Sequence, residues 1–379
     1  MNWVAIRMLT GDRVKFLGLV FGIAFSTLLI TQQLTLFVNL IFRGGVAVQE
    51  VSTADIWVMD PASRTADVIF PMPITALDRV RAVPGVAFAS PMLRSNATIR
   101  TPDGDLEGVT VIGVDDSALI GLPRRMTEGS RERLMDPNAV FIDDTGARKL
   151  FGDSPDVVGT ELELNDQRAI VKGIVDSVPT FTAQVTLYTR YSNALNYVPG
   201  TRNRLSFVLV RSDGSISAEQ LTARITEQTG LKARTSEDFT RDGVNFIVEN
   251  TGIPINFGIT VILGVVVGVA IVGLTLSLFL RDNIKQFGML KAIGVTNRKI
   301  MDMVAAQSFL VILIGYGLGL AMATAFIGLG AANNDAFKGF YMLWEIPLIT
   351  LGLVLAIVGV TSHIAMRGVL NTDPASVFR

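Results

Sequence analysis

The side chains that could perform catalysis are few in this sequence and lie far apart. The chain has no cysteine, and its single histidine, His363, lies in a hydrophobic stretch near the C-terminus. A serine–histidine pair or a zinc site with histidine ligands is therefore excluded between residues 43 and 249. Two adjacent carboxylate pairs occur there, at 115–116 and 143–144. Neighbouring side chains of a strand point to opposite faces, so we expect these aspartates to close turns or cap helices.

The sequence also lacks the phosphate-binding motif G-x-x-x-x-G-K-S/T, whose backbone amides and lysine hold the phosphates of ATP. If this protein works with ATP, we expect a separate polypeptide to bind the nucleotide. The formal net charge is −1, which gives no indication of a nucleic-acid partner, and we expect none. These absences make a membrane enzyme the least favoured function.

Four long stretches without a charged residue indicate a membrane protein. They cover residues 16–42, 250–280, 304–334 and 346–366, in a chain of 379 residues with a mean hydropathy of +0.45. A helix needs about 20 residues to cross a hydrocarbon core of about 30 Å, so we predict four transmembrane helices. The first stretch is too long for the apolar part of a signal peptide, usually about 7–15 residues, and we expect it to be retained.

The distribution of positive charge predicts the orientation. Arginine and lysine cluster before the first stretch and between the second and third, whereas the loop between the third and fourth has only Lys338. The positive-inside rule then places both termini and residues 281–300 in the cytoplasm. The predicted segments are a cytoplasmic amphipathic lead (1–15), a first span (16–42), a periplasmic domain (43–249), a second span (250–280), a cytoplasmic helix and turn (281–300), a third span (301–334), a short periplasmic loop (335–345), a fourth span (346–366) and a cytoplasmic tail (367–379).

The segment between the first two spans has the composition of a water-soluble domain. Its roughly 200 residues can form one or two domains with their own cores. Short β-like runs and two helix-like runs, 75–83 and 217–230, predict an α+β fold. Asn165-Asp166 lies within a run of alternating polarity and predicts a hairpin, and Ser217 predicts a helix N-cap. The predicted fold class is therefore a membrane protein with four transmembrane α-helices and a large α+β extracytoplasmic domain inserted between the first and second.

Small and polar residues within the spans predict helix contacts. The small pairs at four-residue spacing allow close helix approach, within one subunit or across a dimer; they are Gly18/Gly22, Gly264/Gly268, Gly315/Gly319 and Ala321/Ala325. Gln32, Thr35 and Asn39 share one face of the first span. They are candidates for a substrate-lining face between subunits, and the alternative is hydrogen bonding between helices.

One charged stretch, RDNIKQFGMLKAIGVTNRKI at 281–300, separates two very hydrophobic spans. Ile284, Phe287 and Leu290 form one apolar stripe if the stretch is helical. Gly294 is a plausible helix stop, and Thr296 a plausible N-cap for the next helix. We therefore predict a short helix along the membrane surface followed by a sharp turn. It either serves as a contact for a cytosolic partner or lies on lipid headgroups without one.

This stretch resembles the loop signature of ABC-transporter permeases of the MacB/FtsX superfamily. NIKQFGMLKAIGVTNRKI is similar to that family's pattern E-F/I-G/A-x-L-R/K-A-L/I-G-A-x-x-x-x-I after the second span. The chain's end, NTDPASVFR, resembles the family's D-P-A-x-x-L/I-R tail, and the layout of one span, a large outer domain and three spans agrees. The N-terminal half looks closest to the DevC-like branch. Gln286 and Val295 stand where the family often has Glu and Ala, so the resemblance implies apolar contacts rather than a salt bridge from that Glu.

The resemblance implies a type VII ABC transporter in a bacterial inner membrane. Its permease would be a homodimer whose cytoplasmic helix docks on an ATPase that holds ATP and Mg²⁺. DevC-like members work with a periplasmic membrane-fusion adaptor and an outer-membrane duct and move lipid-like or hydrophobic cargo. Phe287 and Leu290 would supply the buried contact, and Gly294 would permit the turn. The residues implied at the ATPase are Lys285, Gln286, Phe287, Met289, Leu290, Lys291, Ala292, Ile293, Gly294 and Val295.

A second function stays open within the same superfamily. FtsX-like proteins are non-transporting scaffolds that relay the state of an ATPase to cell-wall hydrolases. They resemble this chain in the spans but usually have a much smaller outer domain. The outer segment of roughly 200 residues therefore favours the exporter.

Overall fold

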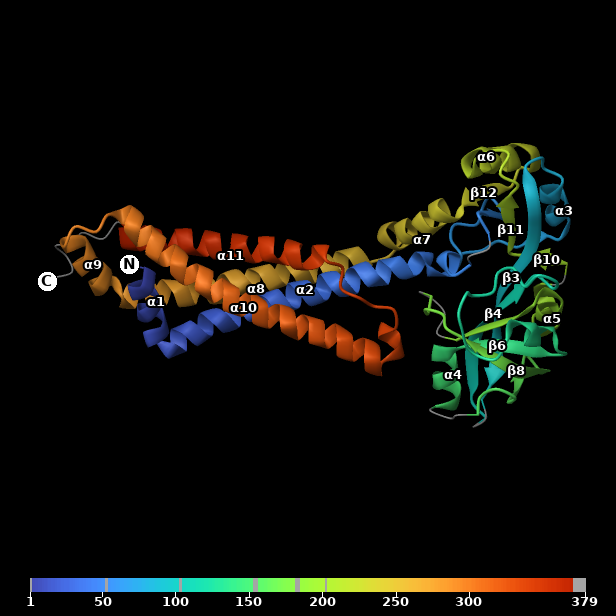
Figure 1. The fold of residues 1–379 in the computed structure, drawn as a ribbon, viewed down its shortest axis with the longest axis horizontal. Helices are drawn as coiled ribbons and strands as arrows, with labels where there is room; N and C mark the ends of the chain where they lie inside the picture. The colour runs from blue at the N-terminus through green and yellow to red at the C-terminus, as the bar shows by residue number, and fades with distance from the viewer. Residues whose placement is uncertain are drawn as a thin grey trace. The chain divides into compact units, whose positions relative to one another are not determined.

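A computed structural model describes residues 2–51, 54–101, 104–152, 156–180, 185–201 and 203–370 (Figure 1). It contains two compact units. One unit comprises Met1–Asn39 and Gly252–Arg379, and the other is Leu40–Thr251. The C-terminal stretch NTDPASVFR, whose resemblance to the family tail is noted above, lies outside the described residues.

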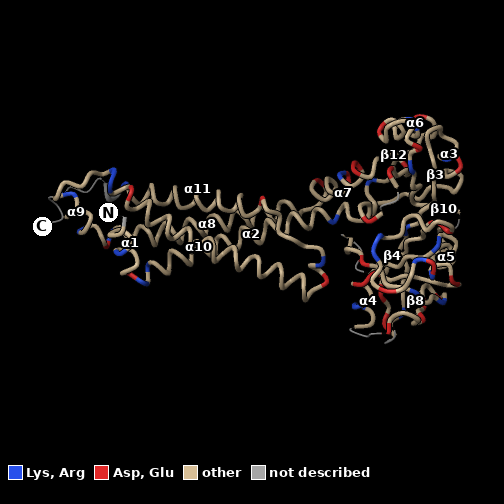
Figure 2. Tube along the Cα trace, in the orientation of Figure 1, with Lys and Arg blue, Asp and Glu red and all other residues tan. Residues whose placement is uncertain are grey.

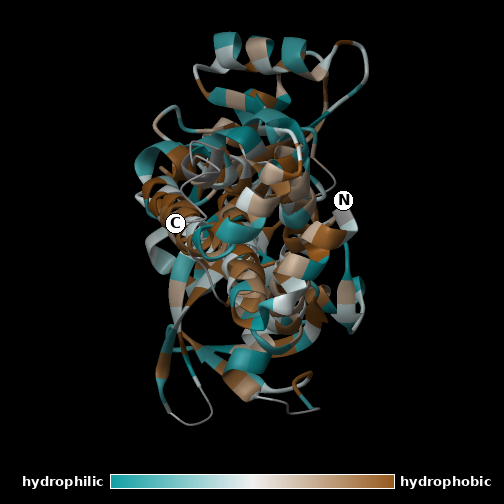
Figure 3. Cartoon of the chain, turned by 90° about the vertical axis from the view of Figure 1, so that its left-hand side faces the viewer, coloured by the Kyte–Doolittle hydropathy of each residue, from teal (hydrophilic) through white to brown (hydrophobic). Residues whose placement is uncertain are grey.

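The first unit is helical. Four helices are long and apolar enough to cross a membrane, as the charge-free stretches predict. The end-on view in Figure 3 shows stretches of brown, hydrophobic helical ribbon. They are α2 (Arg13–Gln49), α8 (Ile253–Asp282), α10 (Asn297–Asn333) and α11 (Glu345–Leu370). The shorter helices are α1 (Asn2–Gly11), α9 (Ile284–Ala292) and the 3₁₀ turn η3 (Asp335–Phe337).

Glycines bring α2 into close contact with its neighbours in this unit. A Cβ atom at Gly22 would lie 2.6 Å from Ile271 Cγ2 on α8. One at Gly319 on α10 would lie 2.5 Å from the carbonyl oxygen of Ala24. Three of the four predicted small-residue pairs therefore pack inside the subunit. The fourth pair, Ala321/Ala325, is exposed on α10.

The second unit is α+β, as predicted, and is built on a ten-stranded mixed sheet in the order β12-β1-β11-β3-β4-β9-β6-β8-β5, with β7 pairing with β3 and β8. The strands of this sheet are β1 (Ile56–Met59), β3 (Val86–Arg100), β4 (Leu106–Val114), β5 (Met126–Glu128), β6 (Ala139–Asp143), β7 (Glu161–Leu164), β8 (Gln167–Val175), β9 (Thr186–Arg190), β11 (Phe207–Ser212) and β12 (Lys232–Thr235). A separate pair is formed by β2 (Met72–Pro73) and β10 (Arg204–Leu205). The helices are α3 (Thr75–Arg81), α4 (Asp144–Phe151), α5 (Tyr191–Tyr197), α6 (Ala218–Thr229) and α7 (Ser236–Asn250), with the 3₁₀ turns η1 (Arg131–Met135) and η2 (Pro199–Thr201).

The sheet is buried on both faces where it carries α7. Strand β1 places Ile56 and Val58 in one hydrophobic core and Trp57 and Met59 in another. Helices α3 and α6 contribute to the first core, and α7 contributes Phe239 to the second. Because both faces are covered, the strand reads as a continuous apolar run rather than an alternating one.

Local signals in the second unit behave as the sequence predicts. Asn165 and Asp166 have φ values of 48° and 61° and join β7 to β8, which is the geometry of a type I′ hairpin turn. Ser217 caps α6 in a capping box with Gln220. The adjacent carboxylates are structural. Asp143 accepts a hydrogen bond from the backbone amide of Gly146 at the start of α4. Asp115 accepts one from the amide of Ala118 in a turn, and Asp116 accepts one from the amide of Ser192 at the start of α5.

Four helical segments of the second unit were not predicted: the short helices α4 and α5, helix α7, and the continuation of α2. Helix α2 continues to Gln49, although the sequence predicts that the first span ends at residue 42. Helix α7 does not correspond to either of the two helices predicted for the domain, 75–83 and 217–230. The predicted span ends before Arg43 because it is defined by the absence of charge, and the following Gly44-Gly45 disfavours an isolated helix by about 1 kcal/mol per residue. Packing against α7 outweighs that preference.

Candidate functional site

Helix α9 lies in the turn between α8 and α10, where the family-like stretch occurs. The backbone amide of Phe287 donates to the carbonyl of Asn283 at 3.1 Å, and the Asn283 side chain donates to the carbonyl of Phe279 at 2.8 Å. These bonds bridge the short break between α8 and α9. The two helices are thus joined by hydrogen bonds as well as by the chain.

The end of α9 is a Schellman motif. The amide of Gly294 donates to the carbonyl of Lys291, and that of Val295 to the carbonyl of Leu290, both at 3.0 Å. Gly294 has a φ of +94°, a conformation that favours glycine, so the predicted stop is confirmed. Thr296 occupies the N-cap position of α10 as predicted, with extended backbone, but its side chain makes no capping bond there.

The stripe predicted to contact an ATPase faces the protein's own core instead. Phe287 is 1% exposed and packs in one cluster with Leu9, Phe279 and Ile300. Leu290 is half-buried against the same cluster, as is Val295. The subunit itself thus covers Phe287 and part of Leu290, and their assignment to a contact with a partner stays a prediction. The period of the stripe was correct, but periodicity alone does not say which surface covers an apolar face.

A second set of side chains occupies the outward face of α9. Met289 is 50% exposed and Ile293, one turn later, is 78% exposed. We call the exposed residues Lys285, Gln286, Met289, Ala292 and Ile293 the outer face of α9. Two large apolar side chains that the unit leaves uncovered, among polar neighbours, are typical of a docking surface. The i, i+4 spacing of Met289 and Ile293 was the sequence signal for it.

The polar side chains of the first span are used within the subunit. Asn39 is 4% exposed, and its amide nitrogen donates to the carbonyl of Tyr341 at 2.8 Å while its amide oxygen accepts from the Tyr341 N–H at 3.1 Å. Thr35 is fully buried and donates to the carbonyl of Thr31. The substrate-lining role for Thr35 and Asn39 stays a prediction; in the structure Thr35 bonds within its own helix and Asn39 bonds the backbone of the loop before α11. Gln32 is half-buried on the same helix.

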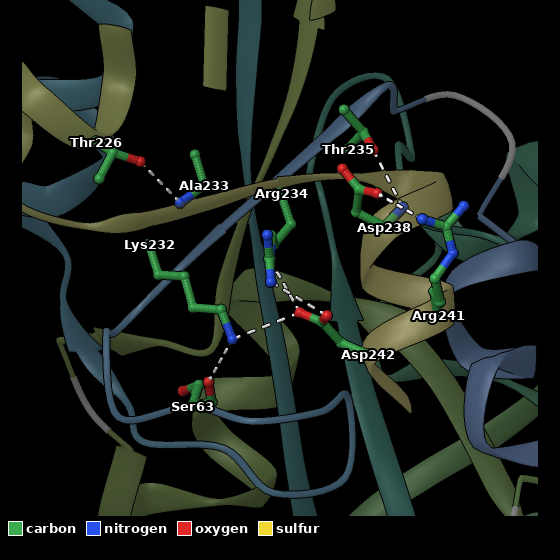
Figure 4. Close-up of polar contacts among 9 residues, drawn as sticks. All are labelled: Ser63, Thr226, Lys232, Ala233, Arg234, Thr235, Asp238, Arg241 and Asp242. Atoms are coloured by element: carbon green, nitrogen blue, oxygen red, sulfur yellow. Dashed lines mark hydrogen bonds and ion pairs between the residues drawn. The ribbon is translucent and has the colours of Figure 1, made fainter. Parts of the chain in front are cut away.

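In the second unit, α7 is fastened to the sheet at its first turns. Thr235 caps the helix by accepting from the Asp238 amide at 3.1 Å. Arg234 of β12 donates to both carboxylate oxygens of Asp242, at 2.9 and 3.2 Å (Figure 4). Lys232 also lies 3.7 Å from this carboxylate and donates to the carbonyl of Ser63. A bidentate arginine–carboxylate pair fixes orientation as well as distance.

An aromatic cluster strengthens the same attachment. Phe239 on α7 lies 5.5 Å from Trp57 on β1 and 5.8 Å from Phe207 on β11, measured between ring centroids. All three rings are at most 1% exposed. We call this attachment, formed by Trp57, Phe207, Lys232, Arg234, Thr235, Phe239 and Asp242, the α7 joint. It makes α7 a rigid extension of the sheet.

The end of α2 crosses α7 in direct backbone contact. A Cβ atom at Gly44 would lie 2.5 Å from the carbonyl oxygen of Gly243, and one at Gly243 would lie 2.1 Å from the carbonyl oxygen of Gly44. At Gly45 it would lie 2.5 Å from a side-chain atom of Thr240. No side chain larger than hydrogen fits at this crossing, so α2 and α7 are locked together at the base of the domain.

The described part of the chain offers no catalytic arrangement. It contains no group of three or more His, Cys, Asp or Glu residues that could hold a metal ion. His363 is exposed on α11.

Comparison with known proteins gives consistent family matches. A family profile described as MacB-like periplasmic core domain matches residues 16–228, more than half of the chain, and one described as FtsX-like permease C-terminal matches residues 258–374. An uncharacterized ABC transporter permease of Mycobacterium tuberculosis is 27% identical over 310 residues, covering 81% of this chain and 79% of that protein. The macrolide export ATP-binding/permease protein MacB of Campylobacter fetus is 24% identical over 309 residues, covering 76% of this chain and 46% of that protein.

Among solved structures, the periplasmic region of MacB from Actinobacillus actinomycetemcomitans covers 54% of this chain and 96% of that chain. The TM-score is 0.40 and the sequence identity is 14%.

The burial of α9 predicts opposite results for two neighbouring side chains. Phe287→Ala should lower the free energy of unfolding by about 3–5 kcal/mol, because a large buried ring is removed. Met289→Ala should change it by less than about 0.5 kcal/mol, because that side chain is half exposed. Equilibrium unfolding of both variants in detergent, followed by circular dichroism, measures the difference. Equal stability of the two variants would show that Phe287 is not part of the core.

Proposed function

Because the chain belongs to the MacB/FtsX superfamily of ABC-transporter permeases, we propose that it is the membrane subunit of an exporter powered by a separate ATPase. In this role it performs no catalysis and converts closure of the ATPase into movement of its outer domain. The observation that carries the proposal is the uncovered apolar pair Met289 and Ile293 on α9. These residues lie within the stretch that carries the family resemblance.

The outer face of α9 is the docking site for the ATPase. Met289 and Ile293 project where the unit itself offers no cover, and burial of side chains of this size in a partner's groove stabilises a complex by about 1.5–3 kcal/mol each. The exposed cations Arg281, Arg298 and Lys299 flank the helix and fit an acidic rim around that groove. The family relatives named MacB carry ATP-binding and permease functions in their names. Here ATP and Mg²⁺ belong to the partner.

The protein is a multi-pass inner-membrane permease, and we place α9 and both termini in the cytoplasm. The reason is the positive-inside rule, since basic residues concentrate around α1, α9 and the start of α10 (Figure 2). The second unit then lies on the periplasmic side. This orientation puts the outer face of α9 where a cytosolic ATPase can reach it.

Movement reaches the outer domain through helices that are fixed at each step. α9 is hydrogen-bonded to the end of α8, and α7 ends two residues before α8 begins. The α7 joint and the glycine crossing then hold α7 to the sheet and to α2. In the proposed mechanism a displacement of α8 passes along the chain to α7, and the contacts of α7 within its own unit carry it to β12.

The assembly and cargo follow the family resemblance. We propose a homodimer in which the exposed small residues Gly317, Ala321 and Ala325 of α10 allow close approach of the second copy. A periplasmic membrane-fusion adaptor and an outer-membrane duct complete the export path, and the cargo is lipid-like or hydrophobic. The four long stretches contain no Asp, Glu, Lys or Arg that could bind an ion within the membrane. A lipid-like or hydrophobic cargo therefore fits these spans better than an ion does.

Loss of the apolar pair should uncouple the ATPase. Met289→Ser combined with Ile293→Ser should weaken ATPase binding by about tenfold or more, because two interface anchors are lost. The measurement is ATP hydrolysis by the purified ATPase, titrated with permease in nanodiscs. Met135→Ser is the matched control, since Met135 is 39% exposed on η1 in the other unit. Unchanged stimulation by the double variant would contradict the docking assignment.

Breaking the α7 joint should separate hydrolysis from movement. Asp242→Asn removes the charge that Arg234 and Lys232 share, so the domain should lose its ATP-dependent displacement while stimulated hydrolysis is retained. Distances between spin labels on β12 in the two copies of the proposed dimer, measured with and without ATP, report the displacement. Glu237→Gln is the control, because Glu237 is 83% exposed and pairs only with Arg241 in the described contacts. A full displacement in Asp242→Asn would exclude the joint from the transmission path.

A further inference from the structure

Helix α1 has an inner face that is firmly held by the bundle. Ala5 and Leu9 are fully buried, and the side-chain amide of Gln307 on α10 donates to the carbonyl of Ala5 at 2.7 Å. Leu9 belongs to the same core cluster as Phe287. The orientation of α1 about its own axis is therefore fixed, and so is the identity of the face that it turns outward.

The outward face of α1 combines an aromatic ring, an aliphatic side chain and a cation. Trp3 is 68% exposed and Val4 is 45% exposed. The guanidinium carbon of Arg7 lies 5.1 Å from the centroid of the Trp3 ring. Tryptophan and arginine in this combination prefer the boundary between hydrocarbon and headgroups. There the apolar ring contacts the acyl chains and the charged guanidinium remains hydrated.

The first turns of α2, which follow α1 after one residue, also expose apolar side chains. Val14 is 81% exposed, Leu17 62% and Phe21 61%. Phe21 and Leu17 lie in a helix long and apolar enough to span the bilayer. Because α1 is joined by a single residue to a helix long enough to span the bilayer, its exposed Trp3 and Arg7 lie at the membrane boundary, and this identifies lipid, not a soluble protein, as the occupant of the face.

The charge on this face is positive and uncompensated. α1 contains no acidic residue. The nearest acid in sequence, Asp12, is paired with Lys15 at 2.6 Å, and Lys15 also lies 2.5 Å from Asp282. Hydrogen bonds from Lys15 lower the pKa of the Asp12 carboxyl, so Asp12 is ionised and committed to that lysine. Among the described contacts, neither Arg7 nor Arg13 has a carboxylate partner.

We propose that the outward face of α1 is a binding site for acidic phospholipids of the surrounding leaflet. Arg7 and Arg13 hold the phosphate oxygens of the headgroups, and Trp3 and Val4 rest at the top of the acyl chains. Guanidinium groups bind phosphate through paired hydrogen bonds, and each basic residue near an anionic surface raises binding by about fivefold. Because Gln307 ties α1 to α10, bound lipid also braces the helix that follows α9. This inference requires membrane insertion but not the proposed exporter role.

The experiment uses the tryptophans of the full chain as probes in lipid vesicles. Trp344→Phe removes the other exposed tryptophan, and the remaining Trp57 is 1% exposed and gives a constant unquenched signal. Bromine on acyl chains quenches tryptophan only on contact. Two vesicle samples of equal overall composition are compared, with bromine either on phosphatidylglycerol or on phosphatidylcholine.

Trp3 should be quenched at least twofold more when the bromine is on phosphatidylglycerol. Arg7→Gln combined with Arg13→Gln should remove this preference without changing the total quenching, since both arginines are exposed. The matched control is Trp3→Phe, which leaves Trp344, 72% exposed beside Glu345, as the accessible probe; Trp344 should show no preference for the acidic lipid. Equal quenching of Trp3 by both lipids would overturn the proposal, and so would an absence of quenching, which would place water or a protein on this face.

Discussion

Close backbone contact at glycine is the interaction on which both units of this protein depend. Helix α2 meets α8 at Gly22 and α10 at Gly319, and its far end meets α7 where Gly44 faces Gly243. In each place a single added Cβ would fall within 2.6 Å of an atom in the other helix. Lipid cannot provide a hydrophobic driving force between helices, so close packing has to hold the first unit together. The same contact locks the base of the second unit.

The fastening of α7 gives this packing a functional meaning. If α7 carries a displacement, as we propose, it must not slide or rotate against the domain that it moves. The Arg234–Asp242 pair restricts rotation because it is bidentate, and Phe239 restricts sliding because its ring is enclosed by two others. Neither contact alone is strong, since a half-exposed ion pair contributes about 1 kcal/mol or less. Together with the glycine crossing, they restrict α7 in different directions.

Sequence patterns were informative where the signal is local. The spans followed from the length of uncharged stretches, the hairpin from Asn165-Asp166, and the end of α9 from Gly294, because each depends on a few neighbouring residues. Helix α7 and the end of α2 were missed because their stability comes from each other. Glycine is unfavourable in an isolated helix and favourable only once a second helix crosses it.

At the candidate site, too, the sequence predicts features set by neighbouring residues but not contacts between residues that are far apart in the chain. The stripe of Ile284, Phe287 and Leu290 was recognised, yet the surface that covers it, including Leu9 and Ile300, lies far away in the sequence. Met289 and Ile293 were among the residues implied at the ATPase, but only the structure separates them, as exposed, from the buried Phe287. Asn39 is a similar case, because its partner is the backbone of Tyr341. Every residue has a backbone N–H or C=O group, so residue types cannot predict such a partner.

The most direct test of the central claim is a contact map of α9 in native membranes. A photo-crosslinking amino acid is placed at Ile293, which is 78% exposed, and in a second sample at Val14, which is 81% exposed in the first turn of α2. Mass spectrometry then identifies the crosslinked species. The account predicts an ABC ATPase at Ile293 and no protein at Val14. A crosslink from Ile293 to lipid alone, or to a protein without an ATP-binding domain, would contradict it.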